Sequence, residues 1–227
     1  MSLIRCLCVL AAFIPTAALA ELREVREVSV SGDWEVKIAP DEVVVTLGID
    51  TFDRAPAAAR RLNQERVKKV MATVATFKVD PTRVQTEQIT IEPRFRKSDS
   101  LELDGYTARK QIVICVTDLA RFDDLLTALL EAGITDVRGI VFRSTKLETA
   151  RDEARIGAVK NARAKANAMA SELGQKLGRP RSVIENLRSS SEGLAYGRSQ
   201  GGAVGETFAP GQISVSASVA VKFELAD

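Results

Sequence analysis

The chain of 227 residues contains no histidine. A serine or cysteine nucleophile activated by an imidazole is therefore excluded. The same absence argues against zinc, copper or haem, because only thiols and scattered carboxylates are left as ligands. We therefore expect no catalytic, cofactor-binding or metal-binding residues, no cofactor, and a protein that is not an enzyme.

Cysteine is almost as scarce, and two of the three cysteines lie in the first twenty residues. These residues are typical of an export signal: Arg5 precedes an apolar run from Cys6 to Leu19, which closes on the small-x-small site Ala18-Leu19-Ala20. The apolar run is shorter than the roughly 20 residues that a membrane-spanning helix needs. A cleaved signal peptide is therefore favoured over a membrane anchor.

We accordingly expect a signal peptide at residues 1–20 and a single domain at residues 21–227. No later segment is long or apolar enough to span a membrane. The mature protein is expected to be soluble and outside the cytoplasm.

Cys115 is the one cysteine that remains after cleavage, so no intramolecular disulfide is available to the mature chain. It lies within an apolar, strand-like run, and a buried, inert thiol is the main interpretation. A redox role and an intermolecular disulfide remain as alternatives.

An excess of charge of one sign is also lacking, since the chain has 32 basic and 30 acidic residues. Aromatic residues make up only 5% of the chain, and no basic segment is interleaved with them. This composition argues against nucleic acid as a partner.

Residues 147–177 predict one long helix. Thr145 and Glu148 have the spacing of a capping box, while Gly174 and Gly178 are stop signals. Small residues recur at every fourth position: Ala150, Ala154, Ala158, Ala162, Ala166 and Ala170, with Leu147, Met169 and Leu173 extending the stripe. Such a stripe fills no deep core but lets the helix lie close against a sheet.

Strands are predicted where apolar residues alternate with polar ones. The clearest begins at Ile213 and places Ser214, Ser216 and Ser218 on its polar face. The other predicted strands are 28–32, its return at 34–38, 43–51, 84–95, 110–117, 137–143 and 181–187. Two further helices are predicted at 54–77 and 118–132, and the run 110–117 is apolar enough to be central in the sheet.

Several strands follow one another directly, which favours antiparallel pairing. We therefore predict an α+β fold: a single domain with a mixed, mostly antiparallel sheet and three helices packed on one face. Residues 189–211 are rich in glycine and serine and predict a long loop between two strands that pair. Its glycine-rich part, 193–205, lacks the ending and the following helix of a phosphate-binding loop.

Four carboxylates near predicted strand ends were considered as an acid–base pair: Asp41, Glu42, Glu87 and Glu92. They carry no spacing signature, and turn chemistry explains Pro40-Asp41 better.

Arg94, Arg96 and Lys97 beside Phe95 form a small basic cluster at a hairpin tip. A solvated loop is the main interpretation and an anion grip the alternative. In the loop that follows, Tyr196 is either a contact residue toward a neighbouring subunit or simply exposed.

Short pieces spread over the whole mature chain resemble, in order and spacing, the SIMPL-domain family, which includes YggE-like proteins and periplasmic immunogenic proteins. The pieces include Val28-Ser29-Val30-Ser31-Gly32, Ala39-Pro40-Asp41, Asn63, Gly105-Tyr106-Thr107-Ala108, Ala162-Arg163, Leu173-Gly174 and Pro210-Gly211-Gln212-Ile213. Arg163 lies where the family has an arginine, with an internal ion pair as the plainer interpretation of that residue.

The resemblance implies an α+β domain and an exported protein in the periplasm of a Gram-negative envelope, associated in some members with the outer membrane. It also implies a ring-like, channel-like homo-oligomer, as in the best-described branch, and a link to oxidative-stress protection. It brings no enzymatic activity and no catalytic residues.

The leading hypothesis is a non-enzymatic envelope protein that self-associates into a homo-oligomer and protects against oxidative or envelope stress. The polar, uncharged strand face at Ser214, Ser216 and Ser218 is suited to line such an assembly. The alternative is a monomeric periplasmic binding module for a small ligand or an envelope protein partner.

Overall fold

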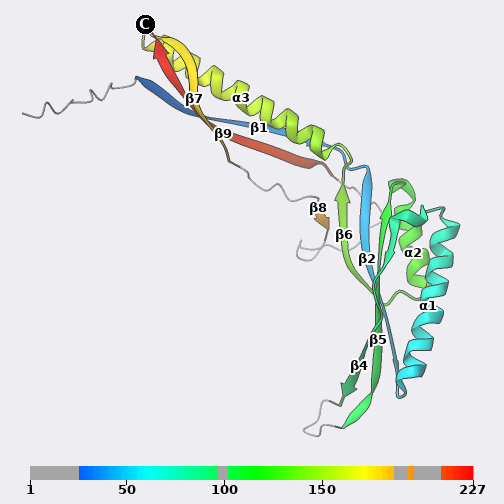
Figure 1. Cartoon of the computed structure of the whole chain (residues 1–227). Helices are drawn as coiled ribbons and strands as arrows, with labels where there is room; N and C mark the ends of the chain where they lie inside the picture. The colour runs from blue at the N-terminus through cyan, green and yellow to red at the C-terminus, as the bar shows by residue number, and fades with distance from the viewer. Residues whose placement is uncertain (1–25, 97–101, 187–193, 197–210, 227) are drawn as a thin grey trace, which may run out of the picture.

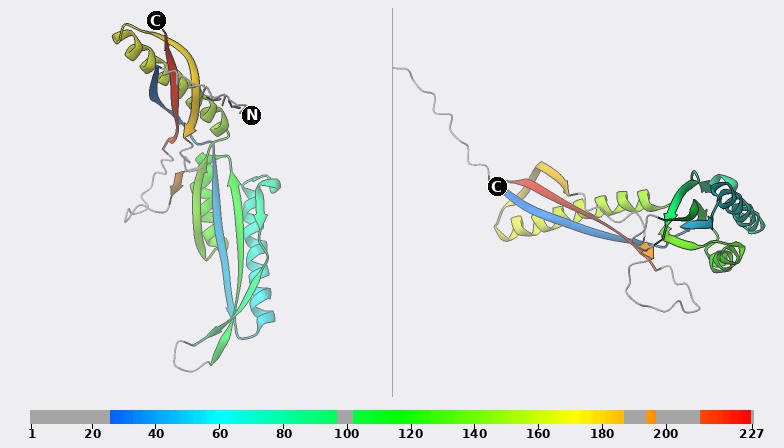
Figure 2. Two further views of the ribbon diagram at one scale, coloured as in Figure 1. Left: turned by 60° about the vertical axis from the view of Figure 1, so that its left-hand side comes forward. Right: turned by 90° about the horizontal axis from the view of Figure 1, so that it is seen from below.

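The chain folds into two antiparallel sheets that lie end to end and give the molecule an elongated shape (Figure 1). The computed structural model describes residues 26–96, 102–186, 194–196 and 211–226. Views from two further directions show the same pair of lobes joined at one narrow region (Figure 2). Each lobe therefore needs its own core.

Lobe A contains a three-stranded sheet in the order β1-β9-β7. Its elements are β1 (Glu27–Ile38), α3 (Leu147–Glu172), β7 (Lys176–Asn186) and β9 (Ile213–Ala226). The helix α3 covers one face of the sheet along its length, and no described helix lies on the opposite face (Figure 1).

The alanine stripe is what lets α3 approach the sheet closely. All six alanines at the four-residue repeat are buried, from Ala150 to Ala170. A Cβ placed on Gly32 of β1 would lie 2.1 Å from the carbonyl oxygen of Ala158 and 2.5 Å from the nitrogen of Ala162. At Gly32 the strand has no side chain, and the facing part of the helix has only the methyl groups of alanine. The backbones of β1 and α3 are therefore in direct contact.

A four-residue repeat also makes the stripe wind around the helix, by about 40° at each step, because the helix has 3.6 residues per turn. Such a winding stripe matches a twisted sheet better than a flat one. The inward residues of β9 complete this core: Ile213, Val215, Ala217, Val219, Val221 and Phe223.

Lobe B contains a sheet in the order β3-β5-β2-β6-β8, with β4 pairing the other half of the long β5. Its strands are β2 (Glu42–Asp53), β3 (Val84–Thr86), β4 (Thr90–Phe95), β5 (Leu103–Val116), β6 (Asp136–Arg143) and β8 (Leu194–Tyr196). Its helices are α1 (Pro56–Thr76), α2 (Phe122–Ala132) and the short 3₁₀ turns η1 (Pro81–Arg83) and η2 (Leu119–Arg121).

Alternating residues of β2 and β5 pack beneath α1 and α2 to form the second core, which includes Val45, Leu47, Ile112, Ile114 and Phe122. This core shares no residue with the core of lobe A. Beyond the start of α1, β4 and β5 continue as a projecting two-stranded arm (Figure 1).

Asn63 ties α1 to the two central strands of lobe B. Its side chain is fully buried, and its Nδ2 donates hydrogen bonds to the carbonyl oxygens of Ile49 (2.7 Å) and Ala108 (3.1 Å). Nearby, the Thr51 hydroxyl donates to the carbonyl of Ala59 at 2.8 Å. A buried amide at this position fixes where the helix crosses the sheet.

Asp41 holds together the two chain segments that cross between the lobes. Its Oδ1 accepts a hydrogen bond from the Thr145 amide (2.8 Å), and its Oδ2 accepts one from the Thr145 hydroxyl (2.5 Å). The Asp41 amide donates to the carbonyl of Arg143 at 3.0 Å. The β1–β2 corner is thereby fastened to the β6–α3 corner.

The α+β class, the three helices and the mostly antiparallel pairing are confirmed, and β7 and β9 do pair across the long loop. The strands form two sheets, however, where the sequence predicted one. The physical reason is that β1 leads directly into β2 without pairing with it, so the two strands belong to different sheets.

Several local expectations also change. Residues 28–38 are one strand instead of two, because Gly32 serves close helix packing and not a turn. The segment 84–95 is divided between β3 and β4. The predicted strand 181–187 begins earlier, at Lys176.

The capping box before α3 is wrong: Thr145 binds Asp41, and no side chain caps the helix. The helix ends at Glu172, and Met169 and Leu173 lie exposed beside the stripe instead of extending it. Most of the predicted loop 189–211 lies outside the described residues.

Candidate functional site

The open face of sheet A carries the site that the geometry best supports. A shallow groove of ≈ 380 Å³ runs across the paired strands β1 and β9, lined by Asp33, Trp34, Glu35, Ser216, Ala217 and Ser218. Asp33 lies opposite Ser218, and Glu35 lies opposite Ser216. Strand alternation puts these four polar side chains on the face away from α3.

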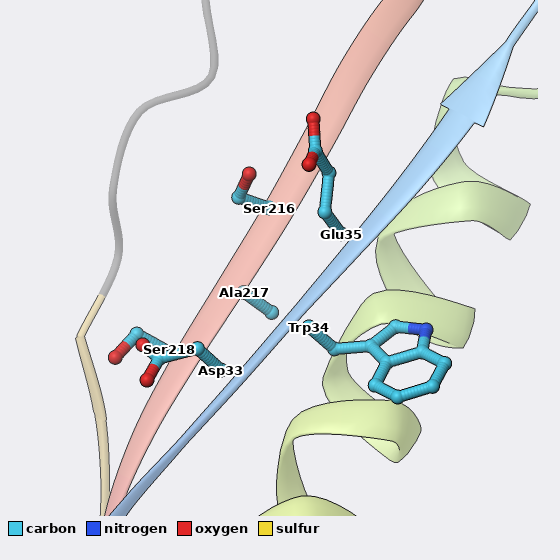
Figure 3. A pocket seen from close by; sticks show the side chains of 6 residues that line it. All are labelled: Asp33, Trp34, Glu35, Ser216, Ala217 and Ser218. Carbon is cyan, nitrogen blue, oxygen red and sulfur yellow. The ribbon is translucent and has the colours of Figure 1, made fainter.

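Figure 3 shows that separation directly. Asp33, Glu35, Ser216 and Ser218 point to one side of the strand pair, and Trp34 points to the other side, toward α3. The indole lies over Gly157, where an added Cβ would meet the ring Cγ at 2.2 Å. The groove therefore has hydroxyl and carboxylate walls and no aromatic platform.

The electrostatics of the groove are set by Asp33 and Glu35 on one strand, with Lys37 next along the same face. The nearest cation to Asp33 from the helix is Lys165, whose Nζ lies 4.0 Å from Oδ2. Carboxylate and hydroxyl oxygens accept hydrogen bonds, so this groove is suited to bind a cationic or hydroxyl-rich partner. It is open to solvent and carries no activated nucleophile.

The expected face of Ser214, Ser216 and Ser218 is confirmed, since all three lie on the side away from α3. The contribution of Asp33 and Glu35 was missed by sequence reasoning. The alternation of residues along β1 carried the signal for it. The sequence predicted a turn within this segment, and the strand makes no turn there.

The four carboxylates considered as an acid–base pair are not brought together. Asp41 binds Thr145, and Glu42 binds Arg83 at 3.0 Å. Glu87 accepts from the Gln111 amide at 2.7 Å, and Glu92 pairs with Arg109 at 2.9 Å. Each carboxylate has its own partner.

Cys115 is half-buried on β5, beside Arg83 and Glu42. The Arg83 Nη1 lies 3.2 Å from the sulfur, and the thiol lies 3.4 Å from a Glu42 oxygen. Burial raises the pKa of Cys115, and the hydrogen bond from Arg83 offsets this only in part. The raised pKa favours the protonated, less nucleophilic thiol. The side chain is only partly buried, however, because Ile114 and Val116 point into the core and Cys115 lies on the other face of β5.

The basic cluster at the arm is neutralised across the strands. Arg94 pairs with Asp104 at 2.5 Å and stacks over Phe52, 3.8 Å from the ring centroid. Arg96 pairs with Glu102 at 3.4 Å. Both arginines are thus engaged in cross-strand ion pairs, which argues against the anion-binding alternative. Lys97 lies outside the described residues.

A charged network on the uncovered face of lobe B was not foreseen. Arg109 bridges Asp50 and Glu92, and Arg138 bridges Asp50 (3.5 Å) and Asp136 (2.9 Å). Hydrogen bonds to Asp136 raise the pKa of Arg138, which stays charged. The network joins four strands, β4, β5, β2 and β6, and holds them together on this face.

Arg163 is exposed on α3 and forms no ion pair with the part of the chain that the structure describes. The side chain of Tyr196 is outside the described residues. Among the described residues, no group of three or more acidic or thiol side chains is placed to hold a metal ion. No helix in the described ranges is both long and apolar enough to cross a membrane.

A family model named SIMPL, described as a protein of unknown function (DUF541), matches residues 28–223. The chain is 26% identical over 182 residues to the uncharacterized protein YggE of Edwardsiella ictaluri, covering 78% of this chain and 76% of that protein. It is 25% identical over 167 residues to a 26 kDa periplasmic immunogenic protein of Brucella melitensis, covering 71% and 67% of the two chains.

A human protein named interleukin-1 receptor-associated kinase 1-binding protein 1 is 26% identical over 172 residues, covering 74% of this chain and 63% of that protein. The match of the family model begins in β1 and ends in β9, so it spans both lobes. This chain belongs to the SIMPL family.

Proposed function

We propose that this protein is a non-enzymatic component of the bacterial envelope that works by self-association into a homo-oligomer. The observation that carries the proposal is the sheet of lobe A. One of its faces is open and rich in small polar side chains, and no described strand pairs with the outer side of β7. Open sheet surfaces and edges of this kind are templates for association with another chain.

The described residues support a role in binding more than one in catalysis. The carboxylates are held in separate ion pairs and hydrogen bonds, and the whole chain lacks histidine. Exposed apolar side chains support association: Val183 is 56% exposed and Ile184 is 59% exposed on the outer strand β7.

The test is the molar mass of the mature protein, residues 21–227, measured by mass photometry at nanomolar and by light scattering at high micromolar concentration. We expect a species of two or more chains, with a population that grows with concentration. A protein that stays strictly monomeric at high micromolar concentration would contradict the proposal.

The proposed location is the periplasm, on the strength of the signal-like residues 1–20 and the relative named periplasmic. The proposed physiological role is protection from oxidative or envelope stress. A deletion strain challenged with peroxide or with a membrane-damaging agent should survive less well than the parent. Equal survival under both challenges would remove this part of the proposal.

A monomeric binding module is the second candidate, favoured by the groove between Asp33, Glu35, Ser216 and Ser218. A ligand held there would stabilise the folded protein and raise its melting temperature. Thermal-shift screening of cationic and hydroxyl-rich compounds separates the two candidates when the wild type is compared with Asp33→Asn and Glu35→Gln. A shift that both variants lose, in a protein that stays monomeric, would favour the binding module.

A further inference from the structure

The two edges of sheet A are protected unequally. On β1, the edge is covered by side chains of α3: the Lys165 Nζ donates to the carbonyl oxygen of Ser31 at 2.9 Å, and Asn161 accepts from the amide of Asp33 at 3.4 Å. Covering an edge in this way blocks the addition of another strand. The structure shows no comparable backbone contact on the outer side of β7 among the described residues.

The same contacts reveal which backbone groups of β1 point outward. In an antiparallel ladder the amide and the carbonyl of one residue point to the same side, and neighbouring residues alternate. Ser31 and Asp33 therefore point away from β9, and Gly32 and Trp34 point toward it. Their partners on β9 are Val219 and Ala217.

The same alternation of backbone direction determines which residues of β7 point outward. If Val219 and Val221 direct their backbone groups to β1, then Ala220 must direct its groups to β7, where it pairs with Ile184. The amide of Leu225, another odd-numbered residue, does donate toward the β1 side, to the carbonyl of Arg26 at 3.0 Å. Val183 and Glu185 therefore present their amides and carbonyls at the free edge.

The side chains along this edge are suited to burial. Val183 and Ile184 are more than half exposed, on opposite faces of the strand. On α3, Arg155 contacts Glu185 at 2.8 Å, and Val159, one turn later on the same side of the helix, is 44% exposed. Among the described residues, an apolar strip thus lies exposed on lobe A beside a strand edge that no other described strand pairs with.

We propose that this edge pairs antiparallel with β7 of a second copy, across a two-fold axis that places Val183 opposite Val183 of the second copy. The inference rests on the proposed self-association and names its surface. Backbone alternation allows only registers that bring outward-pointing residues together. Of these, a centre on Val183 opposes two exposed apolar side chains, whereas a centre on Glu185 would oppose two carboxylates.

The pairing has a natural limit and a structural consequence. Pro180 has no amide hydrogen, and the register of β7 shifts on both sides of it, so regular pairing ends there. Two three-stranded sheets would become one continuous sheet with both α3 helices on the same side. The two serine-rich faces would then form a single surface on the opposite side.

The experiment compares Val183→Lys with Ile156→Lys in the mature protein. Ile156 is 57% exposed on the side of α3 away from the sheet, so it is a matched control. Sedimentation velocity should show that Val183→Lys raises the dimer dissociation constant by roughly tenfold or more, since it opposes two ammonium groups at the axis. Ile156→Lys should leave the dissociation constant unchanged.

A cross-link tests the register independently of any loss of folding. Directly opposed residues in such a pair have Cα atoms about 5.5 Å apart, within disulfide range. Val183→Cys combined with Cys115→Ser should form a covalent dimer under mild oxidation, and Ile156→Cys in the same background should not.

The outcomes separate this inference from the function on which it rests. If the wild type self-associates but Val183→Lys has no effect and Val183→Cys does not cross-link, the β7 edge is the wrong surface and self-association stands. A wild type that is monomeric at high micromolar concentration overturns both.

Discussion

Asp41 shows how one side chain can decide the relation between two lobes. Its carboxylate is the acceptor for both the amide and the hydroxyl of Thr145, and these hydrogen bonds join the only two segments that cross between the lobes within residues 26–186. The hydroxyl hydrogen bond is the main cause that lowers the pKa of Asp41.

We expect Asp41→Ala to lower the free energy of unfolding by roughly 1–2 kcal/mol at pH 7, because two charge-assisted hydrogen bonds are lost at a partly exposed site. The folded pKa lies below the ordinary value of 3.8, so the stabilisation is present above that value and is lost as pH falls through the folded pKa. Urea denaturation at pH 7 and pH 3 should show the difference between variant and wild type shrinking in acid.

Thr145→Ser is the matched control for that measurement, because it keeps both donors. It should unfold within about 0.5 kcal/mol of the wild type. An equal loss in Thr145→Ser and Asp41→Ala would mean that the hydrogen bonds to Asp41 are not what holds the junction.

Single residues were predicted well where chemistry alone decides their role. The outward face of Ser214, Ser216 and Ser218 followed from the alternation of their strand. The partner of Thr145 did not, because Asp41 is distant in sequence and its carboxylate competes with the helix for the hydroxyl.

At the scale of the element, α3 packs closely on the sheet because its buried face carries little side-chain volume. Six buried alanines face β1 and β9, and Gly32 brings the main chain of β1 against the main chain of the helix. The sequence predicted the stripe and its partner sheet, but it ended the first strand at Gly32. Only the packed structure shows that the missing Cβ is needed for contact.

Gly32→Ala should therefore destabilise the protein by roughly 1–3 kcal/mol, because the new Cβ meets backbone atoms that cannot move independently. Gly139→Ala is the control, since no atom lies within 4 Å of a Cβ at that position of β6. It should leave the free energy of unfolding within about 0.5 kcal/mol of the wild type. Urea denaturation of the two variants at one pH gives both values, and equal losses would refute the close-packing explanation.

At the scale of the whole molecule, two cores that share no residue make the two lobes separate packing units. Lobe B has two helices and a projecting arm, and lobe A has one helix and an open sheet. This division leaves the serine-rich face and the β7 edge at one end of an elongated molecule (Figure 1), accessible to another chain.

The proposed envelope location leads to a prediction about the mature chain. Expressed with its own first twenty residues in a Gram-negative host, the protein should be recovered from the periplasmic fraction with Glu21 at its N-terminus, because Ala18-Leu19-Ala20 is a small-x-small cleavage site. Intact-mass spectrometry reads this directly, and Ala20→Arg should block the cleavage. A full-length mass in the periplasm would contradict it.

The sequence by itself determined the α+β class, the antiparallel pairing, the three helices and the polar face of the last strand, because each follows from a local hydrophobic period. Only the tertiary structure decided that the described strands form two sheets, that Asp33 and Glu35 join the serine face, and that no described strand covers the outer edge of β7. These features depend on which strands pair and on how close a helix can approach. Both are set by contacts between residues far apart in the chain, such as Ser31 with Lys165.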